Sequence, residues 1–118
     1  MNAISALVTE EYQILPDPVT GVVTLSGSLR LAGSAEYAPI GEVLEATVAA
    51  HPEQITIDLR GLEFLNSSGI NMLSKFVLNR RQSPETAVVI LGSAGIPWQG
   101  RSLKNLQRLL PSLSLRIE

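Results

Sequence analysis

A short polar segment, Asn66-Ser67-Ser68-Gly69, carries the most promising chemistry in this sequence. It follows an apolar stretch with strand-like alternation and precedes a stretch with helical periodicity, so it should lie at a strand-to-helix junction. The first N–H groups of a helix have no partner within the helix, and an amide or hydroxyl side chain can cap them. The same N–H groups also accommodate a phosphate. The two serines are therefore either structural caps or sites of phosphorylation.

Phosphorylation here would act on a binding surface rather than on the fold. A phosphoserine adds about −1.5 to −2 charges, which the positive end of a helix tolerates. A partner that docks at this place would instead meet a desolvated dianion. Met72 and Phe76 lie one helical turn apart, off the expected buried stripe, and would form an apolar rim if partly exposed. The predicted partner-binding residues are Asn66, Ser67, Ser68, Gly69, Met72 and Phe76.

Catalytic and metal chemistry fit the sequence poorly. A serine nucleophile needs a base within hydrogen-bond reach, but His51 is the single histidine and no Gly-x-Ser-x-Gly elbow is present. Without cysteine or a second histidine, a transition-metal site would need clustered carboxylates, and none cluster. We therefore expect no catalytic residues, no metal site and no cofactor. A small hydrolase that uses Ser67 is the least favoured alternative.

A second glycine- and serine-containing segment, Gly92-Ser93-Ala94-Gly95, follows an apolar run and resembles a phosphate-binding loop in outline. It lacks the G-x-x-x-x-G-K-[ST] pattern, including the lysine that would reach the phosphates. An ordinary turn beside the serines is the favoured interpretation. A nucleotide-binding module that combines this loop with the helix start at Ser67 stays open as a second hypothesis.

Composition limits the classes of protein that the chain can belong to. Its 118 residues are 45% apolar and 17% charged, which is typical of one globular domain spanning residues 1–118. The formal net charge is −2, and the longest basic run is Arg80-Arg81, so a nucleic-acid interface is not expected. No run approaches the roughly 18 apolar residues of a membrane span, and the N-terminus lacks the features of a secretion signal. These features predict a cytoplasmic protein without membrane association.

The elements that position the serines follow the order β-β-α-β-α-β-α-β, an α/β fold. Strands are predicted over residues 11–15, 22–29, 54–59, 87–91 and 113–117, and helices over residues 35–50, 67–81 and 102–110. Strands that alternate with helices indicate right-handed crossovers and a mixed, mostly parallel sheet with helices packed against it.

Three local features complete this prediction. Pro39 is tolerated only in a first helical turn, so the regular part of the first helix should begin near Ala38. The continuous apolar run over residues 87–91 predicts a strand covered on both faces. Residues 60–66 are expected to form a short turn before the second helix.

Residues 55–70, with the sequence ITIDLRGLEFLNSSGI, resemble the signature of STAS domains, the family of bacterial anti-sigma factor antagonists. In that family an apolar strand ending in Asp-Leu leads through a short turn to Asp-Ser-Ser/Thr-Gly at a helix start. Asp58-Leu59 and Asn66-Ser67-Ser68-Gly69 stand at the matching positions here. The order of elements is also similar, so the resemblance covers nearly the whole chain.

The resemblance implies a phosphorylation switch. The first hydroxyl after the acidic or amide residue is the family's acceptor, which here is Ser67, with Ser68 as the second candidate. It also implies an anti-sigma factor serine kinase with a histidine-kinase-like ATPase fold as partner, and a PP2C-type phosphatase that reverses the modification. The unphosphorylated form would capture the kinase and free a sigma factor.

The sequence departs from the family in two places. Asn66 replaces the usual Asp, which removes a negative charge beside the acceptor. The chain stops just past its last predicted strand, so the family's C-terminal helix is expected to be missing or displaced. Asn66, together with Tyr37-Ala38-Pro39-Ile40, is also similar to a related branch whose members bind diguanylate cyclases. A diguanylate cyclase is therefore the alternative partner.

Overall fold

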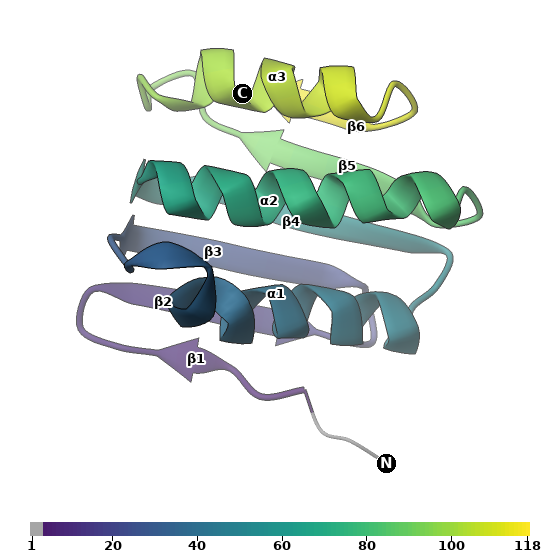
Figure 1. The fold of residues 1–118 in the computed structure, drawn as a ribbon, viewed down its shortest axis with the longest axis horizontal. Helices are drawn as coiled ribbons and strands as arrows, with labels where there is room; N and C mark the ends of the chain where they lie inside the picture. Colours follow the sequence, from purple (N-terminus) through teal and green to yellow (C-terminus); the bar gives the residue numbers. More distant parts are fainter. Residues whose placement is uncertain (1–3) are drawn as a thin grey trace.

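The computed structural model describes residues 4–118 and shows three helices packed against a six-stranded sheet (Figure 1). The strands lie side by side in chain order: β1 Leu7–Val8, β2 Tyr12–Asp17, β3 Val22–Leu29, β4 Gln54–Leu65, β5 Ala87–Gly92 and β6 Ser114–Ile117. The helices are α1 Gly33–Ala50, α2 Ser67–Asn79 and α3 Gln99–Leu109, and one 3₁₀ turn, Arg80–Gln82, follows α2. The pairs β1–β2 and β2–β3 are antiparallel, and β3 to β6 are parallel. The predicted α/β fold with a mixed, mostly parallel sheet is confirmed.

All three helices cover the same face of the sheet (Figure 1). Successive right-handed crossovers that advance one strand at a time in one direction place every connecting helix on one side. On β4, the buried Ile55, Ile57 and Leu59 face these helices, and Thr56 and Asp58 alternate with them. The prediction that the run over residues 87–91 is covered on both faces is wrong, because Val88 and Ile90 are buried but Val89 and Leu91 are only half-buried.

The predicted turn over residues 60–66 is also wrong, since β4 continues to Leu65. Two irregularities in the register with β3 allow this extension, and beyond them Phe64 lies opposite Ser28 and Leu65 opposite Leu29. The chain therefore passes from a paired strand directly to Asn66, and α2 begins at the next residue. This abrupt change holds the polar segment at the end of the sheet.

Helix α1 begins at Gly33 rather than near Ala38, and Pro39 lies inside it. A proline in a helix interior leaves the carbonyl four residues earlier without its N–H partner. That carbonyl belongs to Ala35, and both Ala35 and Pro39 are exposed, so water can replace the missing donor. The helix continues because the defect lies on its solvent side.

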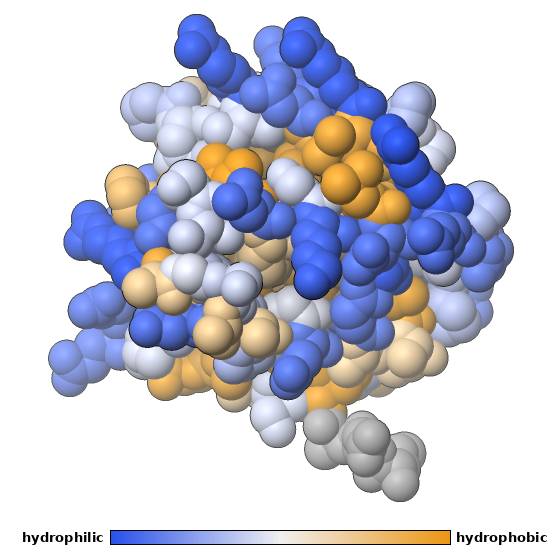
Figure 2. Space-filling model, viewed as in Figure 1, coloured by the Kyte–Doolittle hydropathy of each residue, from blue (hydrophilic) through white to orange (hydrophobic). Residues whose placement is uncertain are grey.

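No helix described between residues 4 and 118 combines the length and apolarity that a membrane span requires. Figure 2 shows hydrophilic side chains over most of the helix-bearing face, with smaller apolar areas among them.

Candidate functional site

Asn66 caps helix α2. Its Oδ1 accepts a hydrogen bond from the backbone N–H of Gly69 at 3.1 Å, and its Nδ2 donates to the carbonyl oxygen of Leu31 at 2.7 Å. A backbone N–H can only donate and a carbonyl can only accept, so both bonds define the same orientation of the amide. The cap therefore comes from the residue before the serines, and the amide also ties α2 to the segment that leads into α1.

Tyr37 joins this network from α1. Its Oη lies 2.7 Å from Asn66 Oδ1 and 3.1 Å from the carbonyl oxygen of Leu29. The ring is fully buried, and burial raises the pKa of the Tyr37 phenol, so the hydroxyl keeps the proton that it donates. The polar segment is thus anchored to the end of β3 and to the first turns of α1.

The two serine hydroxyls are not used by the cap. Ser67 is exposed and Ser68 is half-buried, and neither hydroxyl forms a hydrogen bond with another residue in the range 4–118. They occupy the first two positions of α2, where backbone N–H groups have no acceptor within the helix. An exposed hydroxyl beside unpaired N–H groups can accommodate a phosphate.

Gly69 has a different role from its neighbours, because it is buried. A Cβ atom at this position would overlap the side chain of Leu65 and would lie 2.9 Å from Tyr37 Oη. Its missing side chain lets α2 begin against β4 and α1. The position of Gly69 indicates packing rather than contact with a partner.

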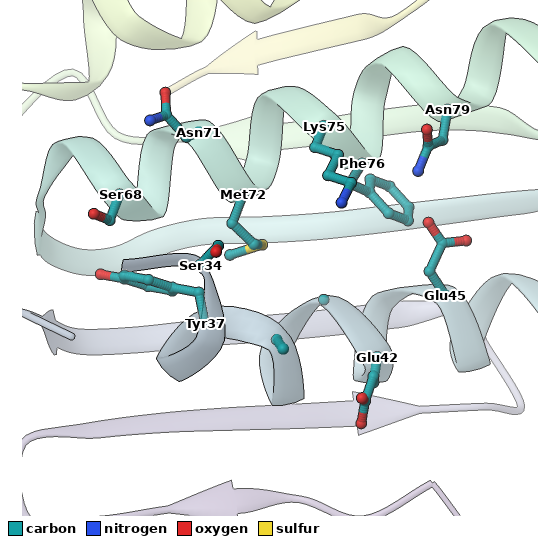
Figure 3. Close-up of a pocket in the computed structure, with 12 residues that line it drawn as sticks. Ser34, Tyr37, Glu42, Glu45, Ser68, Asn71, Met72, Lys75, Phe76 and Asn79 are labelled. Carbon is teal, nitrogen blue, oxygen red and sulfur yellow. The ribbon is translucent and has the colours of Figure 1, made fainter. Parts of the chain in front are cut away.

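Met72 and Phe76 lie in a groove of about 520 Å³ between α1 and α2 (Figure 3). Phe76 is buried at 3% exposure and Met72 is half-buried, so they form the inner wall of a groove rather than a raised rim. The α2 side of the groove consists of Ser68, Asn71, Met72, Lys75, Phe76 and Asn79. The groove therefore begins at the polar segment and continues along the helix.

Sequence reasoning did not predict the α1 side of this groove, which consists of Ser34, Tyr37, Ala38, Gly41, Glu42 and Glu45. Only Tyr37 and Ala38 had been singled out, through the resemblance to the branch that binds diguanylate cyclases. Ser34, Ala38 and Gly41 recur at helical spacing and are all small, a signal that was available in the sequence. Small residues are common on any helix, however, and the partner helix across the groove could not be known. This wall is the main addition that the structure makes to the predicted site.

An ion pair fixes the far end of the groove. Arg80 Nη2 lies 2.5 and 2.7 Å from the two carboxylate oxygens of Glu45, and its guanidinium carbon lies 4.4 Å from the centre of the Phe76 ring. Arg80 is only 6% exposed, whereas the Glu45 side chain is 45% exposed, so water screens the pair from the Glu45 side. The pair joins the C-terminal part of α1 to the end of α2 and neutralises Glu45.

The segment over residues 92–95 does not offer the free amides of a phosphate-binding loop. Ser93 N donates to Gln99 Oε1 at 2.7 Å, Ala94 N to the carbonyl oxygen of Glu118 at 2.9 Å, and Gly95 N to Ser93 Oγ at 3.2 Å. Gly92 is buried, and a Cβ there would lie 2.7 Å from Leu103 Cδ1. The segment serves packing and turn formation, so the nucleotide-binding hypothesis loses this part of its site.

Comparison with known proteins identifies the fold but no family. No protein-family model and no curated protein matches the sequence, so the resemblance to STAS domains stays a prediction. The chain is similar to a chain in the crystal structure of the diguanylate cyclase SiaD in complex with its activator SiaC from Pseudomonas aeruginosa. That match has a TM-score of 0.73 and 12% identity, and it covers 97% of this chain and 99% of that one.

Apo-SiaC from the same organism matches with a TM-score of 0.70 and 14% identity, covering 97% of this chain and 98% of that one. A further structure of SiaC gives a TM-score of 0.68 and 16% identity, with the same coverage. At these identities the likeness shows a shared fold. The fold of this chain is therefore the fold that SiaC adopts.

Proposed function

We propose that this chain is a non-enzymatic regulatory domain that binds a diguanylate cyclase and is switched by phosphorylation of Ser67, with Ser68 as the second candidate acceptor. One observation carries the proposal: Asn66 caps α2, so the exposed Ser67 hydroxyl at the helix start has no structural task. The choice of partner is supported by the shared fold with SiaC, which is the activator of the cyclase SiaD.

The local chemistry suits a reversible switch. A phosphate on Ser67 would lie beside the first N–H groups of α2, where the helix dipole favours negative charge. The cap of Asn66 on Gly69 and its bond to Leu31 do not involve the serine, so the fold should survive modification. A partner surface pressed against this end would have to desolvate the dianion, which opposes binding.

The modifying enzymes belong to the same proposal. A serine kinase with a histidine-kinase-like ATPase fold would add the phosphate, and a PP2C-type phosphatase would remove it. The same junction would also serve an anti-sigma factor antagonist, in which the kinase is itself the captured partner. The observation that favours this second candidate is the strand, Asn-Ser-Ser-Gly and helix arrangement of residues 55–70.

Phosphorylation can be tested by mass spectrometry. The protein is incubated with ATP and a serine kinase of the histidine-kinase-like ATPase fold, taken from the organism that encodes this chain. Wild-type protein and the Ser68→Ala variant should gain one phosphate, whereas Ser67→Ala should gain none. Ser93→Ala is the matched control, because Ser93 lies at the other Ser/Gly junction and its hydroxyl already accepts a bond from Gly95. Modification of Ser67→Ala at the wild-type rate would contradict the assignment of the acceptor.

The choice of partner is tested separately with a purified diguanylate cyclase from the organism that encodes this chain. Unphosphorylated protein should bind the cyclase and change its rate of cyclic di-GMP formation, and the phosphorylated protein should bind at least about tenfold more weakly. If neither form binds the cyclase while a kinase is captured by the unphosphorylated form, the anti-sigma antagonist function replaces it.

A further inference from the structure

We infer that the groove between α1 and α2 receives an α-helix of the partner protein, antiparallel to both helices, with its C-terminal end at Ser68. This inference rests on the proposed protein-binding function and adds the kind of segment that binds, its orientation and the direction of the switch. It is carried by the shape of the groove walls, by a glycine in the middle of α1 and by the charges along the rim.

Both walls of the groove carry large side chains (Figure 3), but the α1 wall also carries three small residues at helical spacing. Ser34, Ala38 and Gly41 leave the backbone of α1 close to the surface, and the larger side chains of Tyr37, Glu42 and Glu45 line the rest of this wall. On α2, Met72 and Phe76 form an apolar wall. Each wall runs through about three helical turns, or about 16 Å, which matches a helix of similar length better than a compact small molecule. Small residues on one helix allow a second helix to approach closely.

Gly41 has no structural reason to be glycine within this chain. A Cβ atom added there would lie 3.9 Å from Met72 Cγ, which is ordinary van der Waals contact, so alanine would fit. A glycine in a helix interior costs about 0.5–1 kcal/mol relative to alanine. A partner backbone that packs closely against α1 at Gly41 would explain the glycine, which no contact within this chain explains.

The rim of the groove carries one free charge of each sign. Glu45 is neutralised by Arg80, but neither Glu42 on α1 nor Lys75 on α2 forms an ion pair among residues 4–118. An amphipathic helix with apolar side chains at helical spacing, a basic residue facing Glu42 and an acidic residue facing Lys75 would complement both walls. A purely apolar ligand would leave both charges unpaired.

The orientation follows from the helix dipoles. Both α1 and α2 connect parallel strands on one face of the sheet, so they run in the same direction. Their N-terminal ends, at Ser34 and Ser68, give this end of the groove a positive potential. A third helix is favoured when it runs the other way, because its negative C-terminal end then lies at Ser68.

This orientation sets the direction of the switch. A phosphate on Ser67, next to Ser68, adds about two negative charges where the C-terminal end of the partner helix lies. The phosphate cancels the positive potential and repels the end of that helix. The unphosphorylated form therefore binds, and phosphorylation releases the partner.

The probe is a synthetic amphipathic peptide of about 14 residues, with leucines at helical spacing and the two complementary charges described above. In ¹H–¹⁵N NMR spectra it should shift the amide resonances of Gly41, Met72 and Phe76. A copy with a central proline, which cannot form the helix, should not shift them.

The orientation of the peptide is tested with a nitroxide on its C-terminal end, which should broaden the amide resonance of Ser68 more than that of Asn79. The effect of charge at the switch is tested with the Ser67→Asp variant, which should bind the peptide about two- to fivefold more weakly at low salt.

Filling the groove tests its location. Gly41→Leu should weaken binding of the peptide at least about tenfold, while Gly100→Leu, the same change in α3 at a glycine with no atoms within 4 Å of an added Cβ, should not. If Gly41→Leu does not fold, Lys75→Glu replaces it. That variant should lose affinity for the peptide and regain it when the facing acid of the peptide is changed to lysine.

Four results would overturn the inference. Absence of shifts at the groove would indicate another binding surface, and equal shifts from the helical and proline peptides would indicate an extended segment. Shifts with decanoate but not with the peptide would indicate a small apolar ligand. Shifts that depend only on the concentration of the protein would indicate a second copy of this chain. Failure of the proposed function is distinguishable, because it would appear as loss of cyclase binding or of Ser67 phosphorylation while the peptide still binds.

Discussion

Two serine- and glycine-containing junctions lie at the same edge of the sheet and have opposite roles. Asn66-Ser67-Ser68-Gly69 follows β4, and Gly92-Ser93-Ala94-Gly95 begins at the last residue of β5. At the first junction one amide side chain performs the cap and leaves both hydroxyls free. At the second, the backbone N–H groups of residues 93–95 and the hydroxyl of Ser93 are bonded within the chain. The two junctions contain the same types of residue, so what distinguishes a candidate binding site from a structural turn is whether their polar groups already have hydrogen-bond partners within the chain.

The amide side chains that organise the two junctions also differ in burial. Asn66 is half-buried, whereas Gln99 at the start of α3 is fully buried. Gln99 Nε2 lies 2.6 Å from the carbonyl oxygen of Leu59 and 3.0 Å from that of Leu62, and Oε1 accepts from Ser93 N. The second junction is therefore locked from the interior, while the first is held near the surface, where a modifying enzyme can reach it.

The largest effect is expected from Gln99→Glu. The change is nearly isosteric but places a carboxylate oxygen against the carbonyls of Leu59 and Leu62 in a fully buried site. It should lower the free energy of unfolding by about 3 kcal/mol at neutral pH, measured by urea denaturation. Gln107→Glu, in the same helix but half-buried, is the matched control and should cost less than half as much. Equal costs would show that the buried lock at the second junction is not special.

Gly69→Ala should have the next largest effect, about 2 kcal/mol, because the new methyl group overlaps Leu65 and approaches Tyr37 Oη. Gly95→Ala is its counterpart at the second junction. A Cβ there lies 3.6 Å from Ser93 Oγ, so its free energy of unfolding should stay within about 0.5 kcal/mol of wild type. If both variants unfold at the same urea concentration, Gly69 is not required for the close packing of α2.

Asn66→Asp, the residue usual in STAS domains, should cost about 1 kcal/mol in the same urea measurement. The aspartate still accepts from Gly69 N, but it cannot donate to the carbonyl oxygen of Leu31. Asn66→Ala removes both bonds and should cost more. A stability of Asn66→Asp equal to that of wild type would mean that the tie to Leu31 is dispensable.

The sequence predicted the order of the main elements and the polar segment at the start of α2, because apolar periodicity and the Asn-Ser-Ser-Gly pattern are local signals. It did not predict β1, the extension of β4 or the start of α1. The β4 extension depends on register irregularities against β3, and α1 tolerates Pro39 because Ala35 is exposed. The lock by Gln99 arises from contacts between distant segments, for which one sequence carries no signal. The small residues of the α1 wall are visible in the sequence, but the helix that faces them across the groove is not.

The smallest effect concerns the outer brace of the second junction. Arg60 Nη2 and Nε donate to Asp58 at 2.9 and 3.0 Å, and Nη1 donates to Glu118, whose backbone bonds to Gly92 and Ala94. The hydrogen bonds from Arg60 lower the pKa of the Asp58 carboxyl below its ordinary value. The ion pair therefore stabilises the fold at every pH above the ordinary pKa, and this stabilisation is lost as the pH falls through the lowered pKa. Wild type should therefore lose stability more steeply than Arg60→Gln as the pH falls below the ordinary Asp pKa of about 3.9, and the two unfolding curves should converge at the acid end. Arg101→Gln, which removes an exposed guanidinium without an ion pair among residues 4–118, should retain the wild-type slope. If Arg60→Gln also retains that slope, the contacts of Arg60 with Asp58 and Glu118 do not help to stabilise the second junction.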